Sequence, residues 1–375
     1  MEKIKVLIVD DSAIVREILT QRLSRDPRIE VVGSAMDPYV ARDKLEKLAV
    51  DVITLDIEMP RMDGLSFLRL IMQQAPMPVV VVSSLTKNAN EAAMKALELG
   101  AVDVVPKPGG PFSVEEVVPL LADRIVAASV AKLSRLRDQL GRSAPPAPPA
   151  AQAVKVAHPH QSESSSRPGQ AGRRSYLANI ATTNQLIAIG ASTGGTIALE
   201  VLLRDWEADF PPTLVVIHMP ERFTATFAAR LNELSRAQVK EAAHGDRLQT
   251  GTVYIAPGNY HMLLKTQGTE RLLRIVNGPK VCNQRPAVDP LFDSVAEQAG
   301  RNCVALLLTG MGRDGASGLL RIKEAGGHTI AQDEESSIVW GMPKEAIDLG
   351  AAQEVLPLGR MVRAVKERIS SQGAL

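Results

Sequence analysis

A proline- and serine-rich stretch divides this chain into two parts. Between about Gly141 and Ala181 the sequence runs through APPAPPAAQAV and then HPHQSESSSRPGQAGRRS. Proline cannot join the interior of a helix, and serine-rich sequence has too little apolar surface to offset the entropy lost on ordering. We expect a linker here, semi-extended at first and flexible later, with a folded domain on each side. The length of 375 residues agrees with two domains, because one hydrophobic core rarely serves so long a chain.

Both flanking parts alternate between apolar, strand-like runs and amphipathic helical stretches. Continuous apolar strands that alternate with helices indicate a parallel sheet covered on both faces. We predict an α/β protein with two doubly wound, mainly parallel-sheet domains joined by the Pro/Ser-rich linker. In the second part, short runs are expected as antiparallel strands at Val253–Ala256, Met262–Leu264 and Leu272–Val276. The predicted boundaries are 1–125 for the first domain, 126–182 for a helical extension and flexible linker, and 183–375 for the second domain.

Charge and cysteine usage exclude several classes of protein. The net charge is +1, from 43 basic and 42 acidic residues, which gives no support for a nucleic-acid partner. The two cysteines, Cys282 and Cys303, form neither a disulfide framework nor a metal cluster in the sequence, which favours a reducing compartment. No apolar run approaches 18 residues, and the N-terminus lacks signal-peptide features. We expect a cytoplasmic protein that is not embedded in a membrane.

Polar residues follow four of the expected strands in the first part. They are Asp10 and Asp11, Asp56, Ser83 and Lys107. Parallel strands end at one edge of a sheet, where ligands of such folds bind. Three carboxylates crowded together repel one another unless a hard cation joins them, and Mg²⁺ suits such a group. The arrangement predicts a magnesium site and a carboxylate that attacks phosphorus.

Each of these residues alone has an ordinary structural explanation, as a helix cap or a surface charge, but the motifs around them are specific. Residues 1–125 resemble two-component receiver domains. The resemblance implies a flavodoxin-like fold, phosphorylation of Asp56 by a histidine kinase, and Mg²⁺ held by Asp10, Asp11 and Asp56. It also implies that Lys107 and Ser83 contact the phosphoryl group. The matching motifs are Val9-Asp10-Asp11-Ser12, Asp56 with Met59-Pro60 and Met62-Asp63-Gly64, Ser83-Ser84, and Lys107-Pro108.

The second part carries a possible nucleophilic serine. Gly190-Ala191-Ser192-Thr193-Gly194 fits G-x-S-x-G and lies between an apolar run and a helical stretch. Small neighbours allow a tight turn that exposes the serine, and the helix N-terminus offers free N–H groups to an oxyanion. The same geometry also cradles phosphates or a dinucleotide, so the motif by itself leaves both possibilities open.

A base and a third group favour hydrolysis. His218 directly follows the apolar run Thr213–Ile217, and Asp314 lies in a glycine-rich loop after Cys303–Leu308. Three strand ends would thus bring Ser192, His218 and Asp314 together as a triad. Singly, His218 would more often be a packed histidine and Asp314 a helix cap. Cys282 is a rival nucleophile, but it lacks a placed base.

The order and motifs of the second part resemble the effector domain of chemotaxis protein-glutamate methylesterases. The resemblance implies a Rossmann-like esterase domain that needs no cofactor, acts on glutamate methyl esters of chemoreceptors, and deamidates glutamines. It further implies an oxyanion site at the backbone N–H groups of Thr193 and Met311, and a chemotaxis histidine kinase as phosphodonor. The stretch Val281-Cys282-Asn283-Gln284 departs from the expected, more basic pattern. The matching motifs are Ile189–Gly195, His218-Met219-Pro220, Tyr254–Gly258, Arg285-Pro286, Val288-Asp289, Leu308–Gly312, Asp314-Gly315 and Gly341-Met342-Pro343.

The order of the two parts suggests regulation. An unphosphorylated receiver would lie across the Ser192 edge, and phosphorylation of Asp56 would release it. Two other classes remain open. A DNA-binding response regulator would share the receiver, although no helix-turn-helix or basic face follows the linker. A docking scaffold without chemistry would keep the fold and tolerate loss of Ser192.

Overall fold

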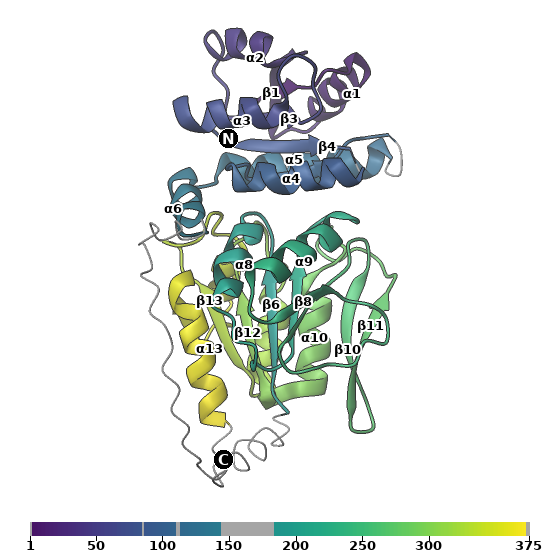
Figure 1. The fold of residues 1–375 in the computed structure, drawn as a ribbon, viewed down its shortest axis with the longest axis vertical. Coiled ribbons are helices and arrows are strands. Elements are labelled where there is room, and N and C mark those ends of the chain that lie inside the picture. The colour runs from purple at the N-terminus through teal and green to yellow at the C-terminus, as the bar shows by residue number, and fades with distance from the viewer. Residues whose placement is uncertain (1, 85, 110–112, 144–183, 373–375) are drawn as a thin grey trace, which may run out of the picture.

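The computed structural model describes residues 2–84, 86–109, 113–143 and 184–372. Most of the expected linker therefore lies outside the described residues. The described chain forms two parallel sheets with surrounding helices, one built from the N-terminal part and one from the C-terminal part (Figure 1).

The N-terminal part is a five-stranded parallel sheet with the strand order β2-β1-β3-β4-β5. Strands β3 and β4 are buried at every residue, which explains their uninterrupted apolar sequences. The strands are β1 (Ile4–Val9), β2 (Ile29–Ala35), β3 (Val52–Asp56), β4 (Val79–Ser83) and β5 (Asp103–Pro106). The helices are α1 (Ala13–Leu23), α2 (Pro38–Leu45), α3 (Gly64–Gln74), α4 (Lys87–Glu98) and α5 (Val114–Ser129).

Short polar residues fix where these helices begin. The side chains of Ser12, Asp37, Asp63 and Thr86 each accept a backbone N–H of the first turn. Ser113 goes further and forms a capping box with Glu116 at the start of α5. A long helix thus begins directly after Ser113.

The C-terminal part is a seven-stranded parallel sheet with the order β14-β13-β12-β6-β7-β9-β8. The strands are β6 (Leu186–Ala191), β7 (Thr213–Ile217), β8 (Gln238–Glu241), β9 (Thr252–Ile255), β12 (Cys303–Leu307), β13 (His328–Gln332) and β14 (Glu354–Leu356). The helices are α8 (Gly195–Arg204), α9 (Phe223–Leu234), α10 (Val288–Ala299), α11 (Ala316–Glu324), α12 (Met342–Asp348) and α13 (Leu358–Gln372). A separate antiparallel pair joins β10 (His261–Gln267) to β11 (Glu270–Val276).

The fold class agrees with the prediction, with two differences in detail. The antiparallel expectation is right for β10 and β11 but wrong for β9, which pairs in parallel with β7. The sequence analysis also missed β8, β14 and α13. Strands β8 and β14 lie at the two edges of the sheet and are only partly buried, so their sequences lack a continuous apolar run.

The two parts pack against each other through α4 and α5. In Figure 1 these helices lie between the N-terminal sheet and the α8 and α9 end of the C-terminal part. After α5 the chain turns at residues 130–132 and forms α6 (Leu133–Ser143), which packs against α8. The parallel strands of the second sheet end at this same side, so α5 lies over the edge where Ser192 is found.

Candidate active site

The structure brings Ser192, His218 and Asp314 together in one hydrogen-bonded row. Ser192 follows β6, His218 follows β7, and Asp314 lies in the loop after β12, so three neighbouring strands deliver the three side chains. The Oγ of Ser192 lies 3.0 Å from Nδ1 of His218, and Nε2 of His218 lies 2.7 Å from Oδ2 of Asp314. All three residues are buried.

The surroundings of Asp314 determine which imidazole nitrogen carries the proton. Burial alone would raise the pKa of Asp314, but the hydrogen bond and charge of His218 hold it below its usual value, helped by backbone N–H groups. Those N–H groups belong to Val288, at 2.6 Å, and Asp289, at 2.9 Å. An ionised carboxylate only accepts hydrogen bonds, so Nε2 of His218 donates to it. Nδ1 is then left as an acceptor facing the Ser192 hydroxyl.

Two glycines allow the chain to pass closely around Ser192. Gly194, the N-cap residue that precedes α8, has a φ of 78°, and a Cβ there would lie 2.7 Å from Cβ of Ile338. Gly310 passes beneath the serine, because a Cβ on it would lie 2.7 Å from Cβ of Ser192 and 2.4 Å from Sδ of Met342. The Ser192 N–H donates to the carbonyl of Thr309, which ties the β6 turn to the loop that follows β12.

Two backbone N–H groups near Ser192 remain available to a ligand. Neither the N–H of Thr193 nor that of Met311 donates a hydrogen bond to another described residue. Thr193 is fully buried, whereas Met311 is 39% exposed at the mouth of the site. Free N–H donors beside a nucleophilic oxygen are what a developing oxyanion requires.

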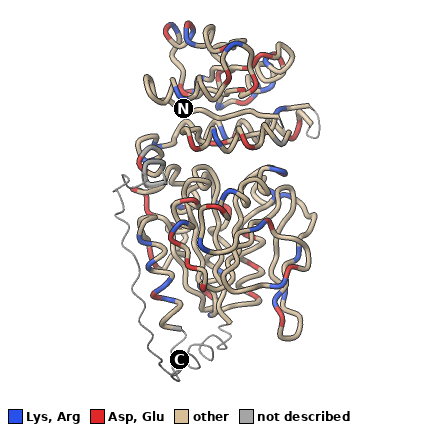
Figure 2. Tube along the Cα trace, in the orientation of Figure 1, with Lys and Arg blue, Asp and Glu red and all other residues tan. Residues whose placement is uncertain are grey.

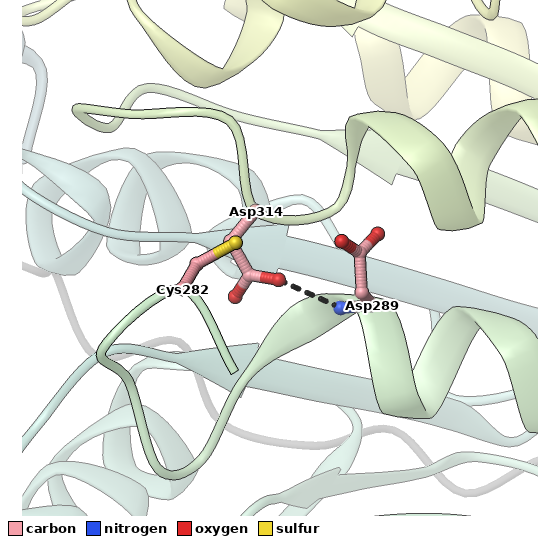
Figure 3. Close-up of side chains that lie close together, drawn as sticks. All are labelled: Cys282, Asp289 and Asp314. Carbon is pink, nitrogen blue, oxygen red and sulfur yellow. Dashed lines mark hydrogen bonds between the residues drawn. The ribbon is translucent and has the colours of Figure 1, made fainter. Parts of the chain in front are cut away.

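Cys282 lies beside the carboxylates of Asp289 and Asp314 (Figure 3). Burial and the neighbouring Asp314 charge raise the pKa of the Cys282 thiol. A protonated thiol is a weak nucleophile, which disfavours Cys282 as a rival to Ser192. Burial likewise raises the pKa of Asp289 to about 6, with contributions from the charges of Asp314 and Asp293 and an opposing hydrogen bond from Gly318.

The other described histidines have partners away from this row. His244 contacts the carbonyl of Ile275, His261 lies between Pro279 and Ala287, and His328 pairs with Glu354. His158 and His160 lie outside the described residues.

An arginine from the N-terminal part occupies the mouth of the row. Arg124 of α5 is 4% exposed, and its guanidinium donates to Oγ of Ser192 at 2.9 Å and to Oγ1 of Thr193 at 3.2 Å. It also donates to the carbonyl of His218 at 2.9 Å. Asp103 of β5 lies 3.5 Å from the same guanidinium and accepts the Thr193 hydroxyl at 2.9 Å.

Sequence motifs alone do not predict the roles of Arg124 and Asp103. One arginine among the apolar residues of an amphipathic helix reads as a surface charge until its neighbours are known. The only available signal was its place on the α5 face that also carries the buried residues Val117 and Leu121.

The carboxylates of the N-terminal part gather as expected at the ends of β1 and β3. One oxygen from each of Asp10, Asp11 and Asp56 lies within 4.8 Å of the others. Lys107 donates to Oδ2 of Asp56 at 2.6 Å and lies 3.4 Å from Oδ2 of Asp10. Burial raises the pKa of Asp56 to about 6, against the opposing effects of Lys107 and with a further contribution from the charge of Asp10.

These residues fit a hard cation. Oδ2 of Asp10 is buried and, apart from the ion pair with Lys107 at 3.4 Å, has no partner in the described structure, and burial raises the pKa of this carboxyl. A divalent cation between Asp10, Asp11 and Asp56 would satisfy that oxygen and offset the crowding of negative charge.

The Ser83 hydroxyl forms no hydrogen bond with Asp56 in the described structure. This hydroxyl faces the carbonyls of Ser84, at 3.3 Å, and Ala89, at 3.4 Å, at the start of α4. Any contact of Ser83 with a phosphoryl group would therefore require this hydroxyl to turn away from α4.

Charge is mixed along the described chain. Figure 2 shows acidic and basic residues interspersed along both parts, without a continuous basic stripe of the kind that binds nucleic acid. Among the described residues, no helix combines the length and apolarity needed to cross a bilayer.

Comparison with known proteins identifies both parts. Residues 187–365 match the family described as CheB methylesterase, and residues 6–118 match the response regulator receiver domain. A protein from Syntrophus aciditrophicus (strain SB), named protein-glutamate methylesterase/protein-glutamine glutaminase 2, is 49% identical over 359 residues, or 96% of this chain and 97% of the relative.

Two further relatives agree. A protein of Leptospira interrogans (serovar copenhageni), named protein-glutamate methylesterase/protein-glutamine glutaminase 3, is 47% identical over 97% of this chain and 99% of its own. A protein of Paraburkholderia xenovorans (strain LB400) with the same enzyme name is 48% identical over 100% of this chain and 98% of its own. The chain belongs to the CheB methylesterase family, as an enzyme in which a response regulator receiver domain precedes the methylesterase domain.

Proposed function

We propose that this enzyme is a serine hydrolase that removes methyl groups from glutamate methyl esters of chemoreceptors and that its receiver controls access to the serine. The observation that carries the first half is the row formed by Ser192, His218 and Asp314. The named relatives are methylesterases and glutaminases, and one triad can serve both reactions because each begins with attack on an acyl carbon. The chemoreceptor substrate places the enzyme in the cytoplasm during chemotactic adaptation.

The reaction follows from the hydrogen bonds. Nδ1 of His218 takes the proton of Ser192 as Oγ attacks the ester carbon, and Asp314 stabilises the imidazolium through Nε2. The N–H groups of Thr193 and Met311 would receive the oxyanion. The imidazolium then protonates the methoxy oxygen, which leaves as methanol as its bond to the acyl carbon breaks. Water hydrolyses the acyl-enzyme, which gives glutamate and restores the Ser192 hydroxyl.

Arg124 supports the regulatory half of the proposal. Its guanidinium occupies the space in front of Ser192 that an ester must enter, so the described arrangement excludes substrate. The triad remains hydrogen-bonded beneath it. Inhibition is therefore steric, and it ends when α5 moves away.

Phosphorylation of Asp56 would provide the release. Asp10, Asp11 and Asp56 would hold Mg²⁺, which supplies charge neutralisation for phosphoryl transfer. Lys107 is placed to neutralise the phosphoryl group on Asp56, and Ser83 would turn toward it. A histidine kinase of the chemotaxis pathway is the proposed phosphodonor. The new negative charge would favour a receiver conformation that packs less well on the Ser192 edge.

Methanol release from methylated chemoreceptor tests the chemistry. Ser192→Ala should lower the rate of the phosphorylated enzyme by several orders of magnitude, because the nucleophile is lost while the fold is kept. Ser134→Ala, on the exposed face of α6, is the matched control. Undiminished methanol release by Ser192→Ala would contradict the serine mechanism and favour another nucleophile, whereas no release by wild type or variant would favour a docking scaffold.

A further inference from the structure

A cavity of about 250 Å³ lies between α5 and the methylesterase domain. It is open to solvent and continues from the site of Arg124 and His218 toward two basic residues, Lys280 and Arg285. The α5 wall of this cavity carries Glu115 and Glu116 at its other end. Opposite charges thus face each other some distance from Ser192.

Arg285 is a fixed cation without an anionic partner. Its guanidinium donates to Oδ1 of Asn259 at 2.6 and 3.1 Å, to Oδ1 of Asn277 at 2.8 Å and to the carbonyl of Gly278 at 2.8 Å. All of these acceptors are neutral. Within the described part of the chain, no carboxylate lies in ion-pair distance of Arg285 or of the exposed Lys280. A guanidinium held rigid and left unneutralised is arranged to meet an anion from outside its own domain.

Residues from successive turns of α5 line this cavity. Glu116 and Arg124 are eight residues apart, which places them about 12 Å apart along the helix axis and about 80° apart around it, and both side chains line the cavity. Lys280 and Arg285 contribute to the electrostatic field at Glu116, although the Ser113 hydrogen bonds at the helix start affect its carboxylate more strongly. The helix thus places an acidic side chain toward the two cations and a long side chain at Ser192.

We propose that Lys280 and Arg285 form an anion subsite that binds an acidic side chain of the substrate helix about two turns from the methylated glutamate, and that α5 occupies the same groove as a substrate mimic. This inference rests on the proposed function. The occupant is an acidic helix because the groove already holds one, and because a segment whose methylated side chains become glutamates is itself acidic.

If α5 mimics the substrate helix, the positions of both Arg124 and Glu116 are explained. Arg124 has the reach of an extended glutamate methyl ester, and its planar end group lies against Ser192 where the ester would lie. Glu116 takes the place of the acidic side chain about two turns away on the substrate helix. Phosphorylation then exchanges one helix for another in a single groove.

Charge reversal at Lys280 tests the subsite. The phosphorylated Lys280→Glu variant should lose about tenfold in kcat/KM on methylated receptor, mainly through KM, because attraction is replaced by repulsion. Its hydrolysis of p-nitrophenyl acetate, a small neutral ester, should equal that of the wild type. Lys265→Glu is the matched control, since Lys265 is an exposed lysine on β10.

A synthetic helical peptide sharpens the test. It carries one glutamate methyl ester and, eight residues before it, either glutamate or glutamine. Wild-type enzyme should prefer the glutamate peptide by about tenfold in kcat/KM, and Lys280→Glu should abolish or reverse that preference. In the unphosphorylated protein, Lys280→Glu should raise p-nitrophenyl acetate hydrolysis, and adding Glu116→Lys should lower it again.

The results separate two failures. If Lys280→Glu and Lys265→Glu act alike on the receptor, and wild type does not distinguish the two peptides, the anion subsite is wrong while the hydrolase stands. If the phosphorylated wild type hydrolyses neither receptor nor small ester, the proposed function fails and the subsite fails with it.

Discussion

At the scale of single residues, Arg124 has the largest expected effect on regulation. It donates to Ser192, Thr193 and the carbonyl of His218 while Asp103 compensates its charge. This set of contacts crosses from the receiver to the catalytic side chains, so the loss of one guanidinium removes all of them. The contacts are buried, so breaking them leaves polar groups without the compensating hydrogen bonds that water would supply at an exposed site.

Arg124→Ala should activate the unphosphorylated enzyme. The substitution both empties the site in front of Ser192 and leaves Asp103 without its cation, so basal ester hydrolysis should rise at least tenfold toward the phosphorylated level. Steady-state hydrolysis of a small ester without phosphodonor measures the effect. Arg42→Ala, an exposed arginine on α2, should leave the basal rate unchanged. An unchanged rate in Arg124→Ala would show that Arg124 does not block the site in solution.

Asp289 should make stability depend on pH in a recognisable direction. Its pKa is raised to about 6 in the folded protein, mainly by burial, from an ordinary value of 3.8. Between these values the folded state holds a proton that the unfolded state has lost, so this group lowers stability as pH rises from about 4 to 6. Asp289→Asn keeps an oxygen to accept the Gly318 N–H and removes the charge.

The melting temperature of Asp289→Asn should therefore exceed that of wild type by an amount that grows from pH 4 to pH 6.5 and is then constant. Thermal unfolding at several pH values measures the difference. Asp209→Asn, at an exposed site, serves as control. A difference that shrinks with rising pH would contradict the raised pKa.

At the scale of elements, α6 behaves as part of the catalytic half. Gln139 donates to the carbonyl of Ser336 at 2.6 Å, Arg135 donates to the carbonyls of Glu334 and Ser337, and Leu136 is fully buried. The segment that α6 contacts leads to Val339, whose carbonyl accepts the N–H of Gly310 beneath Ser192. Through residues 334–339, α6 thus helps to hold Gly310, the residue before Met311, in place.

Substitution of α6 should have the opposite effect to substitution of α5. Leu136→Ala leaves a cavity that costs about 2 to 5 kcal/mol and loosens the 334–339 loop. We expect the phosphorylated enzyme to lose several-fold in kcat and the unphosphorylated enzyme to gain nothing. Ester hydrolysis in both states, with Ser134→Ala as control, measures this. Basal activation by Leu136→Ala would instead mean that α6 leaves together with the receiver.

Sequence patterns predict most helices and strands and the side chains of the candidate site, and the physical reason is burial. Buried parallel strands such as β3 and β12 are continuous apolar runs, and their ends meet at one edge, so Ser192, His218 and Asp314 could be placed together. Edge strands β8 and β14 carry no such signal. Contacts between the two parts depend on how the surfaces of two folded domains pack together, and no local sequence pattern determines that packing. The contact of Arg124 with Ser192 is the main example. The predicted boundaries at 125 and 183 stay predictions, since α6 contacts the catalytic half from within the expected extension.

At the scale of the whole molecule, the two halves are joined by a second charged contact away from Ser192. Arg230 of α9 pairs with Glu98 of α4 and also with Glu200 of α8, at 2.6 Å. Glu98 of the receiver therefore pairs with Arg230, which already pairs with Glu200 in the methylesterase domain. The contact is partly exposed, so it contributes less than the buried contact of Arg124.

Glu98→Gln should weaken the closed arrangement without opening it fully. Basal hydrolysis should rise about two- to fivefold, and the wild-type rate should also rise with salt, because ions screen a partly exposed pair. The Glu98→Gln variant should show a weaker salt response than the wild type. Glu91→Gln, an exposed site on α4, is the control. Equal salt responses in wild type and Glu98→Gln would exclude this pair from the closing contact.

The completed row beneath Arg124 has a consequence for timing. Ser192, His218 and Asp314 are already hydrogen-bonded in this closed arrangement, so the proposed release requires no rearrangement among the three side chains. Under the proposed regulation, the delay before the first methanol leaves would equal the time that the two halves take to separate, and hydrolysis would stop when they pack together again.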